Sequence, residues 1–203
     1  MKRERNGKDG ETRRPQRLRR SGRREERRPV RLQAAPLPSA SIDPKSPRMD
    51  IREARPAESR FIERLSGRVF QPYGTYARMI RGWIDSGQAL ALISLIEGHP
   101  AGFAMTARLS PETNAPGGTE LLAIAVHPKR RRCGIGRMLL QRIEEEMRGQ
   151  GAEVMWLHTA TVNRSARRLF EGKGYRIVQL KHQFYPRGQD ALLMAKRLVA
   201  GLP

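Results

Sequence analysis

The chain has 203 residues, which is enough for one domain of ordinary size and an extension. It holds 40 Lys and Arg against 20 Asp and Glu, for a formal net charge of +20, and it has a single cysteine. One cysteine excludes an internal disulfide framework and is typical of a reducing, cytoplasmic environment. We expect neither a membrane-spanning helix nor a signal peptide, because no apolar run has the necessary length.

Residues 1–48 differ in composition from the rest of the chain. They hold 16 Lys and Arg and 6 Asp and Glu, and therefore half of the net charge in less than a third of the length. Prolines are frequent and large apolar residues are almost absent, so the segment cannot bury enough surface to offset the entropy cost of ordering it. We predict a disordered, Arg- and Pro-rich extension over residues 1–48 and a folded domain over residues 49–200.

Three interpretations of this extension remain open. It could bind RNA, the ribosome or an anionic membrane through its arginines, without sequence preference because it has no aromatic residues for base stacking. It could be an inert, solvated tail. It could also be translated sequence upstream of a true start at Met49, since Arg outnumbers Lys 33 to 7 in the chain, as in GC-rich coding DNA.

The rest of the chain alternates short apolar runs with segments of helical spacing. The apolar runs predict strands over residues 50–54, 89–96, 101–109, 121–126, 154–158, 176–180 and 191–198, with a loop over residues 111–118. Helical spacing predicts helices over residues 59–67, 75–85, 137–149 and 163–175, the last two ended by glycines. This order of elements indicates a mixed α/β sheet with helices on both faces.

The most informative stretch joins the apolar run Leu121–Val126 to the helix expected after it. A proline, four consecutive basic residues and the pair Gly134 and Gly136 lie in between. Glycines let the backbone approach an anion, the free N–H groups of a first helical turn point at it, and arginine forks can pair with phosphate oxygens. The stretch predicts a phosphate site, although it lacks the Gly-Lys-Ser/Thr of a P-loop and the third glycine of a dinucleotide site.

Three blocks of residues resemble the GNAT superfamily of N-acetyltransferases. Its acetyl-CoA pyrophosphate loop is similar to the order Val126-x-Pro128-x-x-Arg131-x-x-Gly134-x-Gly136-x-x-Leu139-Leu140. A second block of that superfamily is similar to Asn163-x-x-Ala166-x-x-Leu169-Phe170-x-x-x-Gly174-Tyr175. The closing hairpin of the Nα-acetyltransferases, above all the bacterial ribosomal-protein alanine N-acetyltransferases, resembles Tyr185-Pro186-x-Gly188-x-Asp190-Ala191-Leu192-Leu193-Met194.

The resemblance covers about residues 119–198 and implies the GNAT fold, a mixed and mostly antiparallel central sheet with helices on both faces. It also implies acetyl-CoA as the cofactor, held by the strand end, by the loop and by an asparagine that caps the next helix. The matching residues are Ile124, Ala125, Val126, Arg131, Arg132, Cys133, Gly134, Ile135, Gly136, Arg137 and Asn163. Cys133 would contribute only its backbone N–H, and no metal site is predicted.

Acetylation of an amine needs a base for the amine, a stabiliser for the thioester oxygen and a proton for the departing thiolate. His158 stands where some eukaryotic Nα-acetyltransferases carry a histidine base and where the bacterial ribosomal-protein enzymes carry glutamate. Imidazole suits this task near neutral pH. Glu120 is an alternative base acting through water, and its other interpretation is a surface charge at the strand edge.

Phe170 departs from the family, which usually has a tyrosine general acid at this position. Three explanations remain: water protonates the thiolate, Tyr185 or Tyr175 substitutes, or the protein is a weak or inactive enzyme. The predicted catalytic residues are therefore His158, Tyr185 and Glu120.

The sequence thus predicts a cytoplasmic, acetyl-CoA-dependent N-acetyltransferase that transfers acetyl directly to an amine. The expected acceptor is the N-terminal α-amine of a protein such as a ribosomal protein. Two alternatives remain: the same chemistry on a small-molecule amine, and a non-catalytic acyl-CoA-binding module. A net-basic domain argues mildly against cationic small acceptors.

Overall fold

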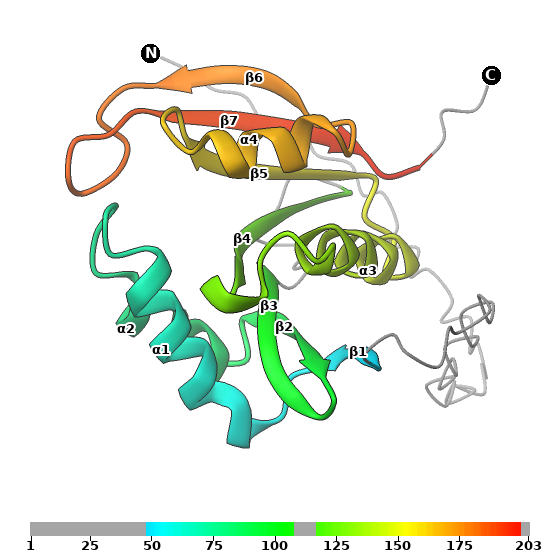
Figure 1. Ribbon diagram of the computed structural model, residues 1–203. Coiled ribbons are helices and arrows are strands. Elements are labelled where there is room, and N and C mark those ends of the chain that lie inside the picture. The colour runs from blue at the N-terminus through cyan, green and yellow to red at the C-terminus, as the bar shows by residue number, and fades with distance from the viewer. Residues whose placement is uncertain (1–47, 108–116, 200–203) are drawn as a thin grey trace, which may run out of the picture. The chain divides into compact units, whose positions relative to one another are not determined.

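The computed structural model describes residues 48–107 and 117–199 (Figure 1). The predicted extension over residues 1–48 lies outside the described residues except for Arg48, and so does its predicted contact with RNA or the ribosome. The loop predicted over residues 111–118 also lies outside them, except for its last two residues. The division of the chain into an extension and a domain at residue 48 therefore stays a prediction.

Within the described residues, seven strands form one sheet in the order β1-β2-β3-β4-β5-β7-β6. Neighbouring strands are antiparallel, except that β4 and β5 are parallel. This arrangement confirms the predicted mixed, mostly antiparallel sheet. The strands are β1 (Met49–Glu53), β2 (Ala89–Ile96), β3 (His99–Ala107), β4 (Gly118–Val126), β5 (Val154–Ala160), β6 (Arg176–Lys181) and β7 (Ala191–Arg197).

Helices cover both faces of the sheet, as predicted (Figure 1). They are α1 (Ser59–Val69), α2 (Tyr76–Asp85), α3 (Ile135–Gly149) and α4 (Arg164–Glu171), with short 3-10 turns at Pro56–Glu58 and Pro128–Arg130. α3 begins two residues before the predicted start, because Ile135 is already buried in the core. No helix in the described part of the chain is long and apolar enough to cross a membrane.

The middle of the sheet is buried on both faces. All eight residues of β2 are buried. Leu90 and Leu92 pack in the core beneath α3 and α4, whereas Ala89 and Ala91 pack in the core beneath α1 and α2. Side chains alternate across a strand, so a strand between two helical layers needs apolar residues at every position. The uninterrupted apolar runs of the sequence therefore mark the central strands.

β4 bends away from β5 halfway along its length. Next to β3, Thr106 pairs with Leu121 and Met105 pairs with Ala123, which leaves Leu122 as an extra residue, a β-bulge. On its other side β4 pairs with β5 only over Gly118–Leu121. Beyond Leu121 the two strands diverge (Figure 1). The carboxyl half of β4 therefore has a free edge on the side that faces β5.

Gly118 and Trp156 set how closely β4 and β5 pair. A Cβ at Gly118 would overlap the Trp156 ring. We expect Gly118→Ala to lower the free energy of unfolding by about 1–3 kcal/mol, because overpacking displaces its neighbours. The matched control is Gly82→Ala in α2, where a Cβ would point into open space, and helix propensity should raise stability there by roughly 0.5–1 kcal/mol. Denaturant unfolding measures both changes, and a G118A protein as stable as the wild type would contradict this packing.

Candidate active site

The loop before α3 exposes backbone N–H groups at a helix N-terminus. Arg132 and Gly134 have φ values of 63° and 77°, so the chain turns through the left-handed region before the helix starts. The first helical hydrogen bond joins Met138 N–H to Gly134 O at 3.1 Å. Ile135 and Gly136, the first two helical residues, therefore have no acceptor for their N–H groups within the helix. A Cβ at Gly134 would meet no atom within 4 Å, so this backbone faces open space.

Exposed basic side chains surround this turn. Arg131, Arg132 and Arg137 are exposed, and Arg131 Nε donates to Val126 O at 3.3 Å. Cys133 is exposed as well, with its Sγ 3.5 Å from the carbonyl oxygen of Arg131. The loop therefore combines positive charge with free N–H groups, an arrangement that suits an anion such as pyrophosphate.

A cavity lies where β4 and β5 diverge, and we call it the splay cavity. Its walls include Ile124 of β4 and Asn163, whose side-chain oxygen accepts a hydrogen bond from Ala166 N–H at 3.2 Å and caps α4. Ala125 faces the opposite core, so only its backbone is available to a ligand here. The residues that line the cavity are Phe70, Tyr73, Tyr76, Ile80, Leu121–Ile124, Leu157–Ala160, Asn163, Ala166, Phe170 and Tyr185.

These features fit the acetyl-CoA that the sequence implied. A pantetheine arm is an extended chain with amide groups, and the free edge of β4 offers it backbone hydrogen-bonding groups. The turn at Gly134 offers N–H groups and arginines to the pyrophosphate. The predicted cofactor residues thus fall into two groups, one along the end of β4 with Asn163 and one at the start of α3.

His158 and Glu120 form a hydrogen-bonded pair at the edge of the splay cavity. His158 Nδ1 lies 3.0 Å from Glu120 Oε1, and their side chains are 16% and 33% exposed. An ionised carboxylate can only accept, so the pair assigns the proton of a neutral imidazole to Nδ1. The Nε2 atom is then a free base, and it is buried without a hydrogen-bond partner in the structure. The two residues that the sequence predicted as alternative bases are therefore hydrogen-bonded to each other.

Phe184 covers one face of His158, a contact that the sequence analysis missed. Its ring stacks on the imidazole with centroids 4.4 Å apart and an angle of 14°. Phe184 is nonetheless 41% exposed, because it lies on the loop between β6 and β7. No motif marks this loop position, and the only signal in the sequence is its place beside Tyr185.

The loop between β6 and β7 meets the loop between α1 and α2, and the first residue of α2, through aromatic contacts. The Tyr185 ring lies 5.1 Å from that of Tyr73 and 6.2 Å from that of Tyr76. Gln189 Nε2 also donates to Pro72 O at 2.7 Å. Burial, with smaller contributions from the two neighbouring tyrosines and Glu120, raises the pKa of Tyr185 far above its usual value.

Phe170, at the position where the chain departs from the family pattern, and its neighbour Tyr175 are packed differently from Tyr185. Phe170 is 3% exposed, lines the splay cavity and packs edge-to-face on Tyr175 with ring centroids 5.7 Å apart. Tyr175 is fully buried, its hydroxyl donates to Met155 Sδ at 3.1 Å, and burial raises its pKa strongly. Of the two tyrosines considered as substitutes for the general acid, Tyr185 reaches the cavity and Tyr175 does not.

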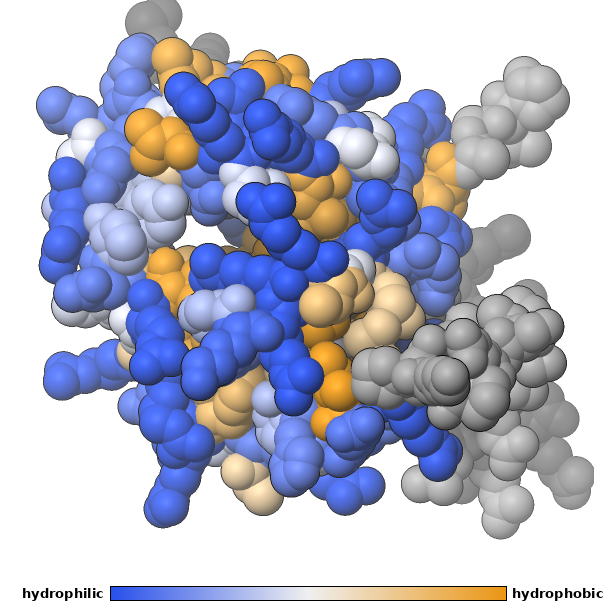
Figure 2. Space-filling view, in the orientation of Figure 1, coloured by the Kyte–Doolittle hydropathy of each residue, from blue (hydrophilic) through white to orange (hydrophobic). Residues whose placement is uncertain are grey.

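A second cavity of about 450 Å³ adjoins the first, and we call it the inner cleft. Figure 2 shows a hollow between the part of the molecule that carries β5–β7 and the part that carries α1 and α2. His158 and Tyr185 line both cavities. The inner cleft is lined by Thr75, Tyr76, Met79, Trp83, Glu120, Leu121, Leu122, His158, Phe184, Tyr185 and Pro186. A second reactant in this cleft would therefore meet the imidazole beside the cofactor.

Two curated relatives are named [ribosomal protein bS18]-alanine N-acetyltransferase. The Salmonella typhimurium protein is 36% identical over 78 residues, which are 37% of this chain and 53% of that protein. The Escherichia coli protein is 32% identical over 101 residues, which are 48% of this chain and 64% of that protein. The chain thus spans between half and two thirds of the length of these relatives.

A solved structure and a family model agree with the similarity to these relatives. A solved acetyltransferase of Salmonella typhimurium, with its cofactor acetyl-CoA, has a TM-score of 0.66 at 22% identity and covers 76% of this chain and 96% of its own. The model of the acetyltransferase (GNAT) family matches residues 53–175, more than half of the chain. This match and the seven-stranded mixed sheet confirm the predicted fold and the predicted family. The chain belongs to the acetyltransferase (GNAT) family.

Proposed function

We propose that this protein acetylates the N-terminal α-amine of a protein, with acetyl-CoA as the donor. The observation that carries the proposal is the His158–Glu120 pair at the junction of the splay cavity and the inner cleft. A base there can serve an amine that enters from the cleft while the cofactor lies along β4. We place the reaction in the cytoplasm, as the sequence predicted.

Acetyl-CoA supplies the acetyl group in activated form, as a thioester. The chain's own residues must then deliver a neutral amine to it. Nε2 of His158 accepts a proton from the acceptor ammonium, and Glu120 holds the imidazole in the tautomer that leaves Nε2 free. Phe184 restricts the ring to one plane by stacking on it.

Tyr185 and the backbone of β4 supply hydrogen bonds rather than a readily released proton. The raised pKa of Tyr185 keeps its hydroxyl protonated near neutral pH, so it can donate a hydrogen bond but holds its proton tightly. A thiolate is a good leaving group, so we propose that water protonates it in place of the tyrosine that Phe170 replaces. The free N–H groups at the end of β4 are the stabiliser for the developing negative charge on oxygen.

A polypeptide acceptor suits the cleft better than a small amine. The inner cleft is open, and its walls come from α2, from β4 and β5, and from the loop between β6 and β7. Aromatic and apolar walls of this kind suit an extended peptide that threads between them. The curated relatives are named for an alanine of ribosomal protein bS18, so a small first residue on a ribosomal protein is the first acceptor to test.

Acetyl transfer to matched peptides tests the acceptor class. We expect the full chain to turn over peptides with Ala or Ser as the first residue at least tenfold faster, in kcat/KM, than polyamines or aminoglycosides. Thiol release from acetyl-CoA is the readout. Turnover confined to small amines would contradict the proposal, and tight acetyl-CoA binding without any turnover would indicate the binding module.

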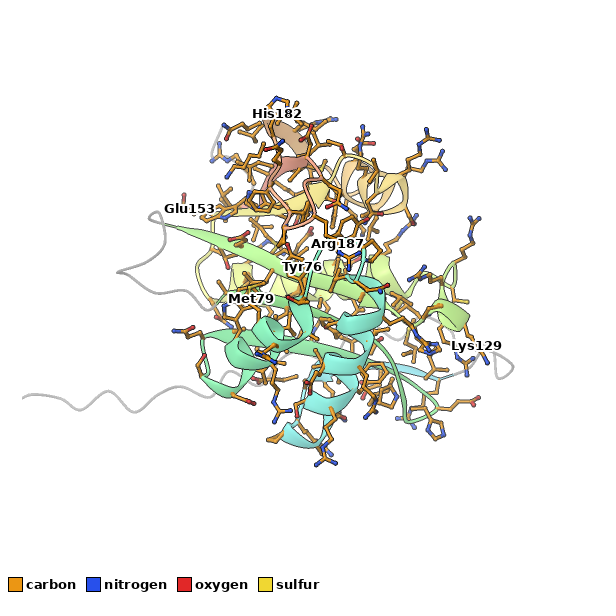
Figure 3. The ribbon with its side chains drawn as sticks, turned by 90° about the vertical axis from the view of Figure 1, so that its left-hand side faces the viewer. Tyr76, Met79, Lys129, Glu153, His182 and Arg187 are labelled. Carbon is orange, nitrogen blue, oxygen red and sulfur yellow. The ribbon has the colours of Figure 1, made fainter. Side chains whose placement is uncertain are left out.

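Substitutions at the histidine test the base. We expect His158→Ala to lower kcat/KM about 10²- to 10⁴-fold at neutral pH. Glu120→Gln should lower kcat about tenfold with little change in KM. His182 also pairs with a carboxylate, at 3.2 Å from Asp190, but it is 75% exposed and lies far from Tyr76 and Met79 (Figure 3). His182→Ala is therefore the control, and equal losses in both variants would remove His158 from the mechanism.

A negative charge introduced just before α3 tests the proposed cofactor site. Asp and Asn both tolerate the left-handed backbone of Gly134 better than other side chains, and a Cβ there meets open space. We expect Gly134→Asp to weaken acetyl-CoA binding about tenfold relative to Gly134→Asn, because only the carboxylate repels the pyrophosphate. Calorimetric titration at low and high salt measures the difference. Equal affinities of the two variants would place the pyrophosphate elsewhere.

A further inference from the structure

We propose that the acceptor peptide carries an acidic side chain after its first residue and that Arg78 and Arg187 bind it. The inference rests on the proposed function, because it concerns the path of a peptide whose N-terminus lies beside His158. It specifies the chemistry of the acceptor, which neither the fold nor the family fixes.

A third cavity of about 750 Å³ adjoins the inner cleft, and we call it the outer cleft. The two clefts share the side chains of Thr75, Tyr76 and Met79. The outer cleft is lined by Glu63, Gly67, Gln71, Gly74–Met79 and Arg187. None of the residues assigned to acetyl-CoA lines it, so it is open to the part of the acceptor that follows the amine.

The two walls of the outer cleft each carry one arginine. Arg78 belongs to α2, and Arg187 belongs to the loop between β6 and β7. Figure 3 shows Arg187 beside Tyr76, with Met79 farther along the same face. Pro186 lies against Gly74, where a Cβ would come within 3.0 Å of its ring. This close approach holds the loop that carries Arg187 against the start of α2.

Both arginines are free to bind a ligand. Neither has a hydrogen bond or an ion pair with any other described residue, and both are exposed. The single carboxylate that lines the outer cleft, that of Glu63, is already engaged at 3.2 Å by Arg81, which also bonds Asp85 at 2.7 Å. The outer cleft therefore presents two unsatisfied guanidinium groups. Their planar forks match the geometry of a carboxylate.

The inner cleft has the opposite charge preference. Glu120 lines it beside the base, so an acidic first residue would meet a like charge there. The structure thus favours a neutral first residue with Asp or Glu farther along the peptide. Because the arginines are exposed, their contribution is one of specificity and rate of association, about three- to tenfold for a single carboxylate.

A charge scan of the acceptor tests this inference. The full chain is given Ala-starting peptides of one background sequence in which a single position, from the second to the sixth, is Asp, Asn or Lys. We expect Asp to exceed Asn in kcat/KM by three- to tenfold at one or two positions after the first, with Lys lower than Asn and the differences shrinking in high salt. Arg187→Glu should reverse the order at those positions, so that Lys exceeds Asp.

Arg176→Glu is the matched control. It makes the same change in net charge on exposed β6, away from all three cavities, and should leave the peptide preference unchanged. Turnover of the peptides with no charge preference, or an equal shift in both variants, would overturn the inference while the proposed function stands. Absence of turnover on every peptide would overturn the proposed function and this inference with it.

Discussion

The site depends on one irregularity, the extra residue Leu122 in β4. The bulge changes the register with β3 and turns the strand, so that its pairing with β5 stops at Leu121. Had β4 and β5 stayed paired to their ends, the free edge of β4 would be closed by hydrogen bonds, and the splay cavity would not exist. The loss of a few strand hydrogen bonds is thus the structural condition for binding a ligand between two strands.

The same divergence places His158, the proposed base. β5 loses β4 after Leu157 but keeps β7 along its whole length, so His158 stays on a rigid strand while its side chain faces the opening. Glu120 lies on the paired part of β4, where its position is equally fixed. The two side chains therefore meet across the point where the strands separate, and their 3.0 Å contact follows from backbone positions that the sheet determines.

Local patterns in the sequence predicted most of the elements and the cofactor loop, because each rests on residues close together in the chain. Gly134 and the arginines around it form one turn before α3. Asn163 caps α4, which begins at the next residue. The bulge at Leu122 could not be predicted, since an extra residue in an apolar run looks like any other. The stacking of Phe184 on His158 depends on how a loop folds back over β5, and Arg187 and Arg78 line one cavity although they are more than a hundred residues apart, so no local pattern encodes either.

Phe170 is consistent with an active enzyme in this setting. Its ring fills the wall of the splay cavity and packs on Tyr175, so a phenol in its place would add a hydroxyl to an apolar contact. The two proton transfers of the reaction differ in importance. A thiolate leaves readily without a general acid, whereas an ammonium cannot attack until it loses a proton. In the proposed mechanism the His158–Glu120 pair removes that proton, so the step on which the rate depends more strongly does not involve the tyrosine that Phe170 replaces.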